Sequence, residues 1–456
     1  MSLNLSFQNI PKDIFKCISF FLKINDAVSL GLSSKNESKL IKTAIYKYIS
    51  VKRWDYKSLT KLPIKLYKHV TLFDCQHKIG VKDLINLKRL FLRGNTLAPS
   101  LIFQPTLTHL TIGFGGGFNR PIEHGVLPIS LTHLTFSGNF NQPIGVGVLP
   151  VNLIDLTFGE NFNQPIDIGV LPQKLQRLAF GTNYNKQIKN DALPLSITSL
   201  FIGEYFDEIF PDGLPMGIKD LSIEWKFLRP IKREFFSKSI TALTIYSHFS
   251  RNFEYKISKE DFPQNLTHLY FYGDFNHHID TGVLPLNLTH LYIHSDRFNH
   301  PIGVGVLPPN LRHLEFGNVF NQPIKINVLP SSLTHLTFGW CFNQPIGVGV
   351  LPPNLTHLTF VRDFNQQIEV NVLPFSLTHL EFGYYFNQPI GVNVLPPNLT
   401  HLNFNEGFNH PIEVGILPQS LKQLEFGRNI NPPISIDVLP KNLKHLNFKK
   451  CFNVFF

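Results

Sequence analysis

The sequence is poor in cysteine and contains no long apolar run. Its 456 residues include only 4 Cys, at positions 17, 75, 341 and 451. Cysteines this sparse and scattered match neither the paired spacing of zinc sites nor the density of a disulfide-stapled domain. No run of about 18 apolar residues and no N-terminal signal segment can be found, so no membrane association is predicted. These absences favour a chain that works in a reducing compartment, the cytoplasm, with the nucleus as the alternative.

Positive charge is scarce outside the N-terminal quarter. The formal net charge is +10, yet the first 100 residues hold 18 Lys and Arg against 6 Asp and Glu, while the remaining 356 hold 24 against 26. A long segment without net positive charge attracts phosphates weakly, so nucleic acid is not an expected partner there. The basic N-terminal quarter leaves contact with nucleic acid or anionic lipid as a weaker hypothesis.

Repetition is the dominant feature of the chain. The phrase FNQPIGVGVLPPNLTHLTF begins at Phe342, and near copies recur from Phe118 to Phe452, mostly every 22 residues. The unit has no 3.6-residue apolar rhythm, so no long helix is expected in each copy. Its segment Leu355–Phe360 has the L-x-x-L-x-L form of a leucine-rich-repeat strand, which predicts one short strand per coil.

The repeat predicts how successive coils stack. One coil cannot bury its apolar residues alone, so we expect a β-rich, leucine-rich-repeat-like solenoid of about 22 residues per coil with a parallel sheet and a column of Phe side chains. The alternation of Ile346, Val348 and Val350 indicates a short strand or an extended run on the return side. Asn343, beside each repeat Phe, is expected to hydrogen-bond backbone groups and form a ladder between coils.

The unit resembles the FNIP repeat, a relative of the leucine-rich repeat. On this basis the chain divides into a separate N-terminal segment (1–50), degenerate leucine-rich-repeat-like coils (51–112) and an FNIP repeat array (113–456). The resemblance implies an interaction protein that binds a target on its array. The final residues 452–456 begin another coil without a polar cap, which would permit end-to-end self-association.

Residues 1–50 differ from the rest of the chain. Their apolar spacing is helical, which by itself predicts a small helical cap for the first coil. The segment also resembles an F-box, from its Ile10-Pro11-Lys12-Asp13 opening to Ser34-Lys35, but Asn36 stands where that family has an aromatic residue. The resemblance implies that a Skp1-type adaptor would contact the following residues: Ile10, Pro11, Ile14, Ile18, Phe21, Leu22 and Leu30.

Two functions follow from this organisation. The F-box resemblance implies the substrate-recognition subunit of a Skp1–cullin–F-box ubiquitin ligase, which holds an unknown protein target and has no catalytic activity of its own. The alternative is a leucine-rich-repeat-like interaction scaffold with no role in ubiquitin transfer, in which the N-terminus only caps the array.

Ten histidines occupy one slot of the repeat. They are His109, His133, His268, His290, His313, His335, His357, His379, His401 and His445. Zinc sites are finite sets of three or four ligands, so an open-ended row predicts an exposed surface ladder and neither a metal nor another cofactor. Like charges so close together disfavour one another, so we expect the row to resist protonation and the array to lose stability as the pH falls.

No residue pattern indicates catalysis. No Ser/His/Asp or Cys/His arrangement stands apart from the repeat, and Glu315, Glu381 and Glu425 are expected to face outward without a fixed partner. An enzyme is therefore not predicted.

The central copies depart most from the repeat phrase. Because repeated residues build the scaffold, specificity is expected where outward positions deviate, and aromatic residues there are typical binding anchors. The candidate target-binding residues on the concave face are Phe201, Glu224, Tyr246, Tyr270, Tyr272, Tyr292 and His294. The alternative interpretation is simple decay of the repeat without a binding role.

Overall fold

The computed structural model describes residues 88–92, 105–113, 117–203, 205–206, 214–224, 236–247, 257–427 and 434–448. The chain forms two compact units, Met1–Ser196 and Ile197–Phe456. The F-box-like segment, including the seven residues expected to meet an adaptor, lies outside the described residues, as do most of the degenerate coils and residues 449–456.

The first unit contains one parallel sheet in which each described strand pairs with the next. Its strands are β1 (Arg89–Leu92), β2 (His109–Ile112), β3 (His133–Phe136), β4 (Asp155–Thr157) and β5 (Arg177–Ala179). A 3-10 turn, η4 (Asn190–Ala192), follows them.

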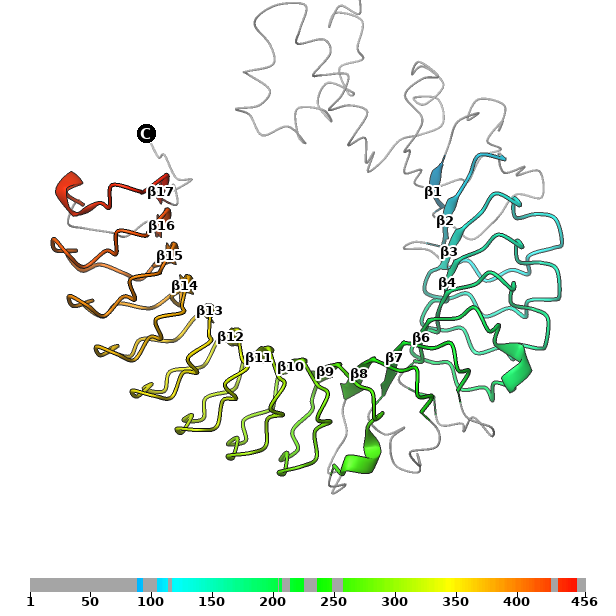
Figure 1. The fold of residues 1–456 in the computed structure, drawn as a ribbon. Helices are drawn as coiled ribbons and strands as arrows, with labels where there is room; N and C mark the ends of the chain where they lie inside the picture. The colour runs from blue at the N-terminus through cyan, green and yellow to red at the C-terminus, as the bar shows by residue number, and fades with distance from the viewer. Residues whose placement is uncertain are drawn as a thin grey trace, which may run out of the picture. The chain divides into compact units, whose positions relative to one another are not determined.

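The second unit repeats this arrangement over twelve described strands, again parallel and paired in chain order. They are β6 (Ser199–Phe201), β7 (Asp220–Glu224), β8 (Ala242–Ser247), β9 (His268–Gly273), β10 (His290–Ser295), β11 (His313–Phe316), β12 (His335–Phe338), β13 (His357–Phe360), β14 (His379–Glu381), β15 (His401–Asn403), β16 (Gln423–Phe426) and β17 (His445–Phe448). Two 3-10 turns, η7 (Lys259–Asp261) and η8 (Ile436–Val438), lie on return segments. The strands line the inner, concave side of this unit, and the return segments form its outer side (Figure 1).

Each strand alternates between core and open face, as the sequence predicts. In β13, Leu358 and Phe360 are buried while His357 and Thr359 are half-buried on the other side. The predicted leucine-rich-repeat-like solenoid is therefore confirmed.

The return side differs from a strand. Ile346 and Val350 are buried, but Val348 is 57% exposed at a turn in which Gly349 has φ = 78°. Asn371, at the equivalent place one coil later, also has a positive φ of 68°. The unit thus places Gly or Asn here because these residues adopt the left-handed conformation most readily.

Two columns of phenylalanine form the core between coils. Phe338 stacks on Phe342 across the bend after the strand, with ring centroids 3.8 Å apart, and on Phe360 of the next coil at 5.5 Å. Phe342 stacks in turn on Phe364 at 6.1 Å. The expected single column is therefore a double one, in which each ring packs within its coil and between coils.

The expected asparagine ladder is also present. The Oδ1 atom of Asn343 accepts the backbone N–H of Asn365 at 2.9 Å and the side-chain amide of Gln366 at 3.0 Å. The Oδ1 atom of Asn321 likewise accepts the backbone N–H of Asn343 at 3.0 Å. Because each amide satisfies a backbone donor of the following coil, the ladder links coils where no strand pairing does so.

Candidate protein-interaction surface

Outward side chains form columns on the open face of the second unit's sheet, because its strands are parallel and in register. The histidine column contains Ser199, Asp220, Ala242, His268, His290, His313, His335, His357, His379, His401, Gln423 and His445. The middle column, two residues further along each strand, contains Phe201, Ser222, Thr244, Tyr270, Tyr292, Glu315, Thr337, Thr359, Glu381, Asn403, Glu425 and Asn447. A third column, on the longer strands β7 to β10, contains Glu224, Tyr246, Tyr272 and His294.

The imidazole rings of the histidine column stack face to face. From His268 to His401, consecutive centroids lie 4.0 to 4.2 Å apart. The Oγ1 atom of Thr356 donates to the carbonyl of Thr334 at 3.0 Å and lies 2.9 Å from Nδ1 of His357. Since a hydroxyl has only one proton to donate, Nδ1 of His357 must carry a proton and donate to Thr356. The Nε2 atom is then an acceptor.

The stacked imidazoles from His268 to His401 resist protonation. Burial and neighbouring imidazoles lower the pKa of His290 and His379 to about 4, and the same causes lower the pKa of His335 and His357. Parallel rings direct their Nε2 lone pairs side by side, without convergence on one point. Among the described residues, no group of three or more His, Cys, Asp or Glu side chains is arranged to hold a metal ion.

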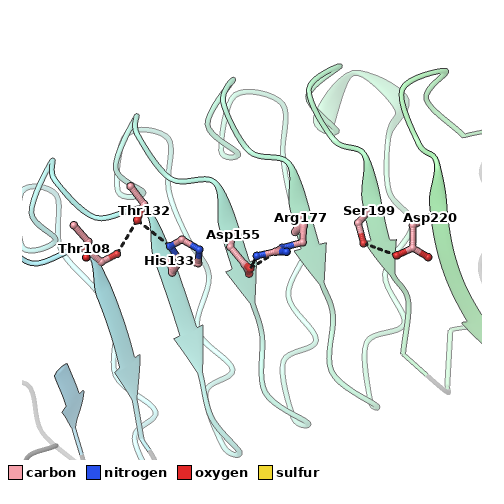
Figure 2. A network of polar contacts seen from close by, with 7 residues as sticks. All are labelled: Thr108, Thr132, His133, Asp155, Arg177, Ser199 and Asp220. Carbon is pink, nitrogen blue, oxygen red and sulfur yellow. Dashed lines mark hydrogen bonds and ion pairs between the residues drawn. The ribbon is translucent and has the colours of Figure 1, made fainter. Parts of the chain in front are cut away.

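Charged and hydroxyl side chains replace the imidazole at several rungs, as Figure 2 shows. In the first unit, the hydroxyl oxygen of Thr132 lies 2.8 Å from Nδ1 of His133, and Arg177 forms an ion pair with Asp155 at 2.7 Å. In the second unit, Ser199 donates to Asp220 at 3.3 Å. At these rungs the substituted side chains still bond to their neighbours along the sheet, whereas Ala242 at the same position cannot.

Six of the seven candidate target-binding residues lie together. We call them the aromatic cluster: Phe201, Tyr246, Tyr270, Tyr272, Tyr292 and His294. Tyr270 and Tyr292 stack at 4.7 Å, and Tyr246 and Tyr272 stack at 5.5 Å. His294 joins the two pairs through edge contacts with Tyr272 at 5.2 Å and Tyr292 at 5.7 Å.

The seventh candidate, Glu224, lies differently. It is in register with Tyr246 but only 6% exposed, so its carboxylate lies beneath the surface of the cluster.

The length of the central strands explains the third column. In many coils a glycine stands at this position, and a Cβ added at Gly339 would collide with the backbone of Gly317 in the preceding coil. In β9 and β10 the sheet pairing continues to Gly273 and Ser295. The longer pairing keeps these neighbouring backbones at strand spacing, so tyrosine and histidine side chains can be accommodated.

Two of the outward carboxylates have partners, contrary to expectation. Oε1 of Glu315 lies 3.0 Å from Nε2 of His294, and Oε1 of Glu381 accepts amide protons from Asn403 and Asn405, both at 3.2 Å. The prediction of outward carboxylates without fixed partners was therefore wrong for these two residues, because partners from adjacent coils cannot be read from a single repeat.

Sequence reasoning also missed an exposed cluster beside the strands. The Arg362 guanidinium lies 5.6 Å from the ring centre of Trp340 and 5.5 Å from that of Tyr385. These side chains come from three consecutive coils at positions after the strand. Their departure from the repeat phrase was the available signal.

The fold and its columns define a leucine-rich-repeat-like solenoid, and comparison with known proteins identifies the repeat. The FNIP Repeat model matches residues 105–139, 118–161, 140–182, 162–205, 253–296, 298–341, 342–385, 364–407, 386–413 and 408–451. The chain belongs to the FNIP repeat family. A comparison with curated protein sequences found no match.

Solved structures agree with this assignment. The crystal structure of CroV588, described as a novel circular LRR protein, is 39% identical with a TM-score of 0.64 over 86% of this chain and 64% of that one. The present chain therefore spans less than two thirds of that relative.

Two more distant structures share the fold alone. TLR13 in its complex with ssRNA13 is 18% identical, with a TM-score of 0.59 over 83% of this chain and 60% of that one. A chain of the mouse RP105/MD-1 complex is 16% identical, with a TM-score of 0.51 over 83% and 77% of the two chains. No helix among the described residues is long and apolar enough to cross a membrane.

Proposed function

We propose that this protein is a non-catalytic adaptor that captures a protein target on the aromatic cluster. The observation that carries this proposal is the contact network of Tyr246, Tyr270, Tyr272 and Tyr292 on the open face of the sheet. Stacked phenol rings offer a large, rigid apolar surface with hydroxyl groups at its edge, which is the composition typical of interface hot spots.

The cluster can be tested with a photo-crosslinking amino acid at position 270 of the full chain, with position 348 on the outer side as control. A protein captured only from position 270 would then be purified and its affinity measured directly. The combined variant Tyr270→Ala, Tyr272→Ala and Tyr292→Ala should weaken this binding at least about tenfold, as expected for hot-spot residues. Thr359→Ala, in the same column four coils away from Tyr270, should bind as the native chain does.

Unchanged binding by the triple tyrosine variant would refute the assignment. That result would favour the alternative, in which the central coils deviate through decay of the repeat.

The same adaptor is proposed to be the substrate-recognition subunit of a Skp1–cullin–F-box ubiquitin ligase in the cytoplasm. Support comes from the F-box-like sequence at Ile10, Pro11, Ile14, Ile18, Phe21, Leu22 and Leu30. In this arrangement the N-terminal segment would bind the ligase while the repeat array holds the target.

Purified Skp1 provides the test of the ligase role. The full chain should retain Skp1 on a column, and a variant with Ile10, Pro11 and Ile14 changed to Ser should not. Circular dichroism on both proteins would check that the array remains folded. Failure of the native chain to bind Skp1 would leave the plain interaction scaffold as the function.

A further inference from the structure

Carboxylates dominate the charge of the second unit's open face. The histidine, middle and third columns of the second unit contain five acidic side chains and no Lys or Arg. Asp220, Glu315, Glu381 and Glu425 lie on the open face, whereas Glu224 is buried beneath it. Since the stacked histidines from His268 to His401 resist protonation and the columns contain no Lys or Arg, the charge within the columns is negative although the whole chain has a formal net charge of +10.

Two of these carboxylates flank the aromatic cluster. Asp220 lies on β7, and its charge contributes to raising the pKa of Tyr246 and Tyr270 after the larger effect of burial. Glu315 lies on β11 next to Tyr292 in register and contributes in the same way to raising the pKa of Tyr292. Carboxylates on β7 and β11 therefore border the four tyrosines, which lie on β8 to β10.

Lysine and arginine flank the tyrosine-bearing strands β8, β9 and β10 but do not lie on them. The residues preceding β8, β9 and β10 are Thr241, Thr267 and Thr289, and Arg297 beyond β10 forms an ion pair with Asp274 at 3.0 Å. Lys219 and Arg312 precede the two flanking strands β7 and β11, outside the three columns. In the part of the chain that the structure describes, β8, β9 and β10 carry no Lys or Arg on the open face.

Two phenol-ring faces in the middle column have no aromatic neighbour. Tyr270 stacks on Tyr292 through one face, and its neighbour on the other side is Thr244, whose side chain is too short to cover a phenol ring. The other neighbour of Tyr292 is Glu315 itself. A cation placed on the outer face of Tyr292 would thus meet the negative face of an aromatic ring and a carboxylate together, and one on the outer face of Tyr270 would lie toward the strand that carries Asp220.

We propose that the aromatic cluster binds a cationic side chain of the protein target, arginine in preference to lysine. The arginine guanidinium is planar, so it stacks on aromatic rings, and it bonds a carboxylate through two parallel N–H groups. The lysine ammonium is not planar and cannot form this two-point contact. This inference rests on the proposed function, since it names the chemistry that the target presents to the same cluster.

Three labelled octapeptides test this inference by fluorescence anisotropy with the full chain. They alternate Ser with Arg, with Lys or with citrulline, the uncharged analogue of arginine. The Arg peptide should bind most tightly, the citrulline peptide should bind at least about tenfold more weakly, and added salt should weaken the Arg complex.

Charge-removing variants locate the site. Asp220→Asn and Glu315→Gln should each weaken binding of the Arg peptide about two- to fivefold, as expected for partly exposed charge pairs. Glu425→Gln removes a carboxylate from the same column far from the cluster and should have no effect. All three changes keep the size of the side chain, and melting temperatures would verify that the variants fold.

Equal binding of the Arg and citrulline peptides would overturn the inference, as would equal effects of Glu315→Gln and Glu425→Gln. If the crosslinked target still binds through the tyrosines under either outcome, the proposed function stands and only the cationic chemistry is refuted. If neither the arginine preference nor the tyrosine-dependent binding of the crosslinked target is observed, both proposals are refuted.

Discussion

The imidazole rings of His357 and His379 lie within 11° of parallel, with their centroids 4.1 Å apart. Each ring is also held by the threonine before it, through contacts of 2.9 Å between Nδ1 and the hydroxyl oxygen. Stacking and the threonine contact both suit the neutral ring. Protons added to Nε2 of two neighbouring rings would place like charges at stacking distance.

The first prediction concerns pH. The folded-state pKa of His290 and His379 is about 4, below the usual value of 6.5, so the unfolded chain binds more protons than the folded one between these values. The stability contributed by the neutral rings is complete above the unfolded pKa and is lost as the pH falls from about 6.5 toward 4. The melting temperature should therefore be lower at about pH 5 than at about pH 7.5.

Replacement of four rungs provides the control for this titration. His313, His335, His357 and His379 changed to Gln would remove the interior of the row, and Gln already occupies this position at Gln423. The variant should show a smaller difference in melting temperature between the two pH values. An undiminished difference would mean that other groups cause the acid sensitivity.

The second prediction concerns the double phenylalanine column. Phe342 is 1% exposed and stacks on Phe338 and Phe364, so Phe342→Ala should lower the free energy of unfolding by about 3–5 kcal/mol. Phe375 offers a matched control because it is 70% exposed. Phe375→Ala should leave the urea midpoint nearly unchanged, and similar midpoints for both variants would contradict the packing assignment.

The third prediction separates two uses of glycine. Gly349→Ala places a side chain in open space at φ = 78°, which costs about 1–2 kcal/mol of conformational strain. Gly349→Asn should be tolerated better, since Asn327 and Asn371 adopt the same conformation.

Gly339→Ala should destabilise the protein more than either change at Gly349. Its Cβ would collide with the backbone of Gly317, and backbone cannot give way as a flexible side chain can. Thermal melts of the three variants rank them directly, and equal losses for the two alanine variants would show that the coils adjust their spacing.

The fourth prediction concerns the asparagine ladder. Asn343→Ala removes the acceptor for the N–H of Asn365, and the expected loss is about 1 kcal/mol because that donor is partly buried. Asn354→Ala removes an exposed hydrogen bond to the carbonyl of Ser331 and should cost less. Hydrogen exchange at the Asn365 amide provides a local measurement, and unaltered protection there would exclude a structural role for the ladder.

The repeat made most of the fold predictable from the sequence. A 22-residue period with Leu355, Leu358 and Phe360 at fixed positions determines strand, core and sheet, because every coil meets a copy of itself. The histidine column and the asparagine ladder also follow from this repetition, because equivalent residues of successive coils lie side by side. The turn at Val348 was not predicted, since alternation alone cannot distinguish an extended run from a turn that exposes its central residue.

The candidate surface was predictable only in part. Departures from the repeat identified the aromatic residues, and six of seven came together, but Glu224 lies below the surface. The pairing of Glu315 with His294 joins side chains 21 positions apart in the chain, and it depends on how far the long strands extend. A single repeat carries no information on such differences between neighbouring coils.

The asparagine and phenylalanine contacts also concern how long such a protein can be. Asn343 and Phe342 each contact the coil before and the coil after. A whole 22-residue unit inserted between two regular coils would thus find every contact already supplied. The energetics therefore determine the shape of a coil and leave the number of coils undetermined, so duplication could lengthen the array while the tyrosine-bearing coils remained intact.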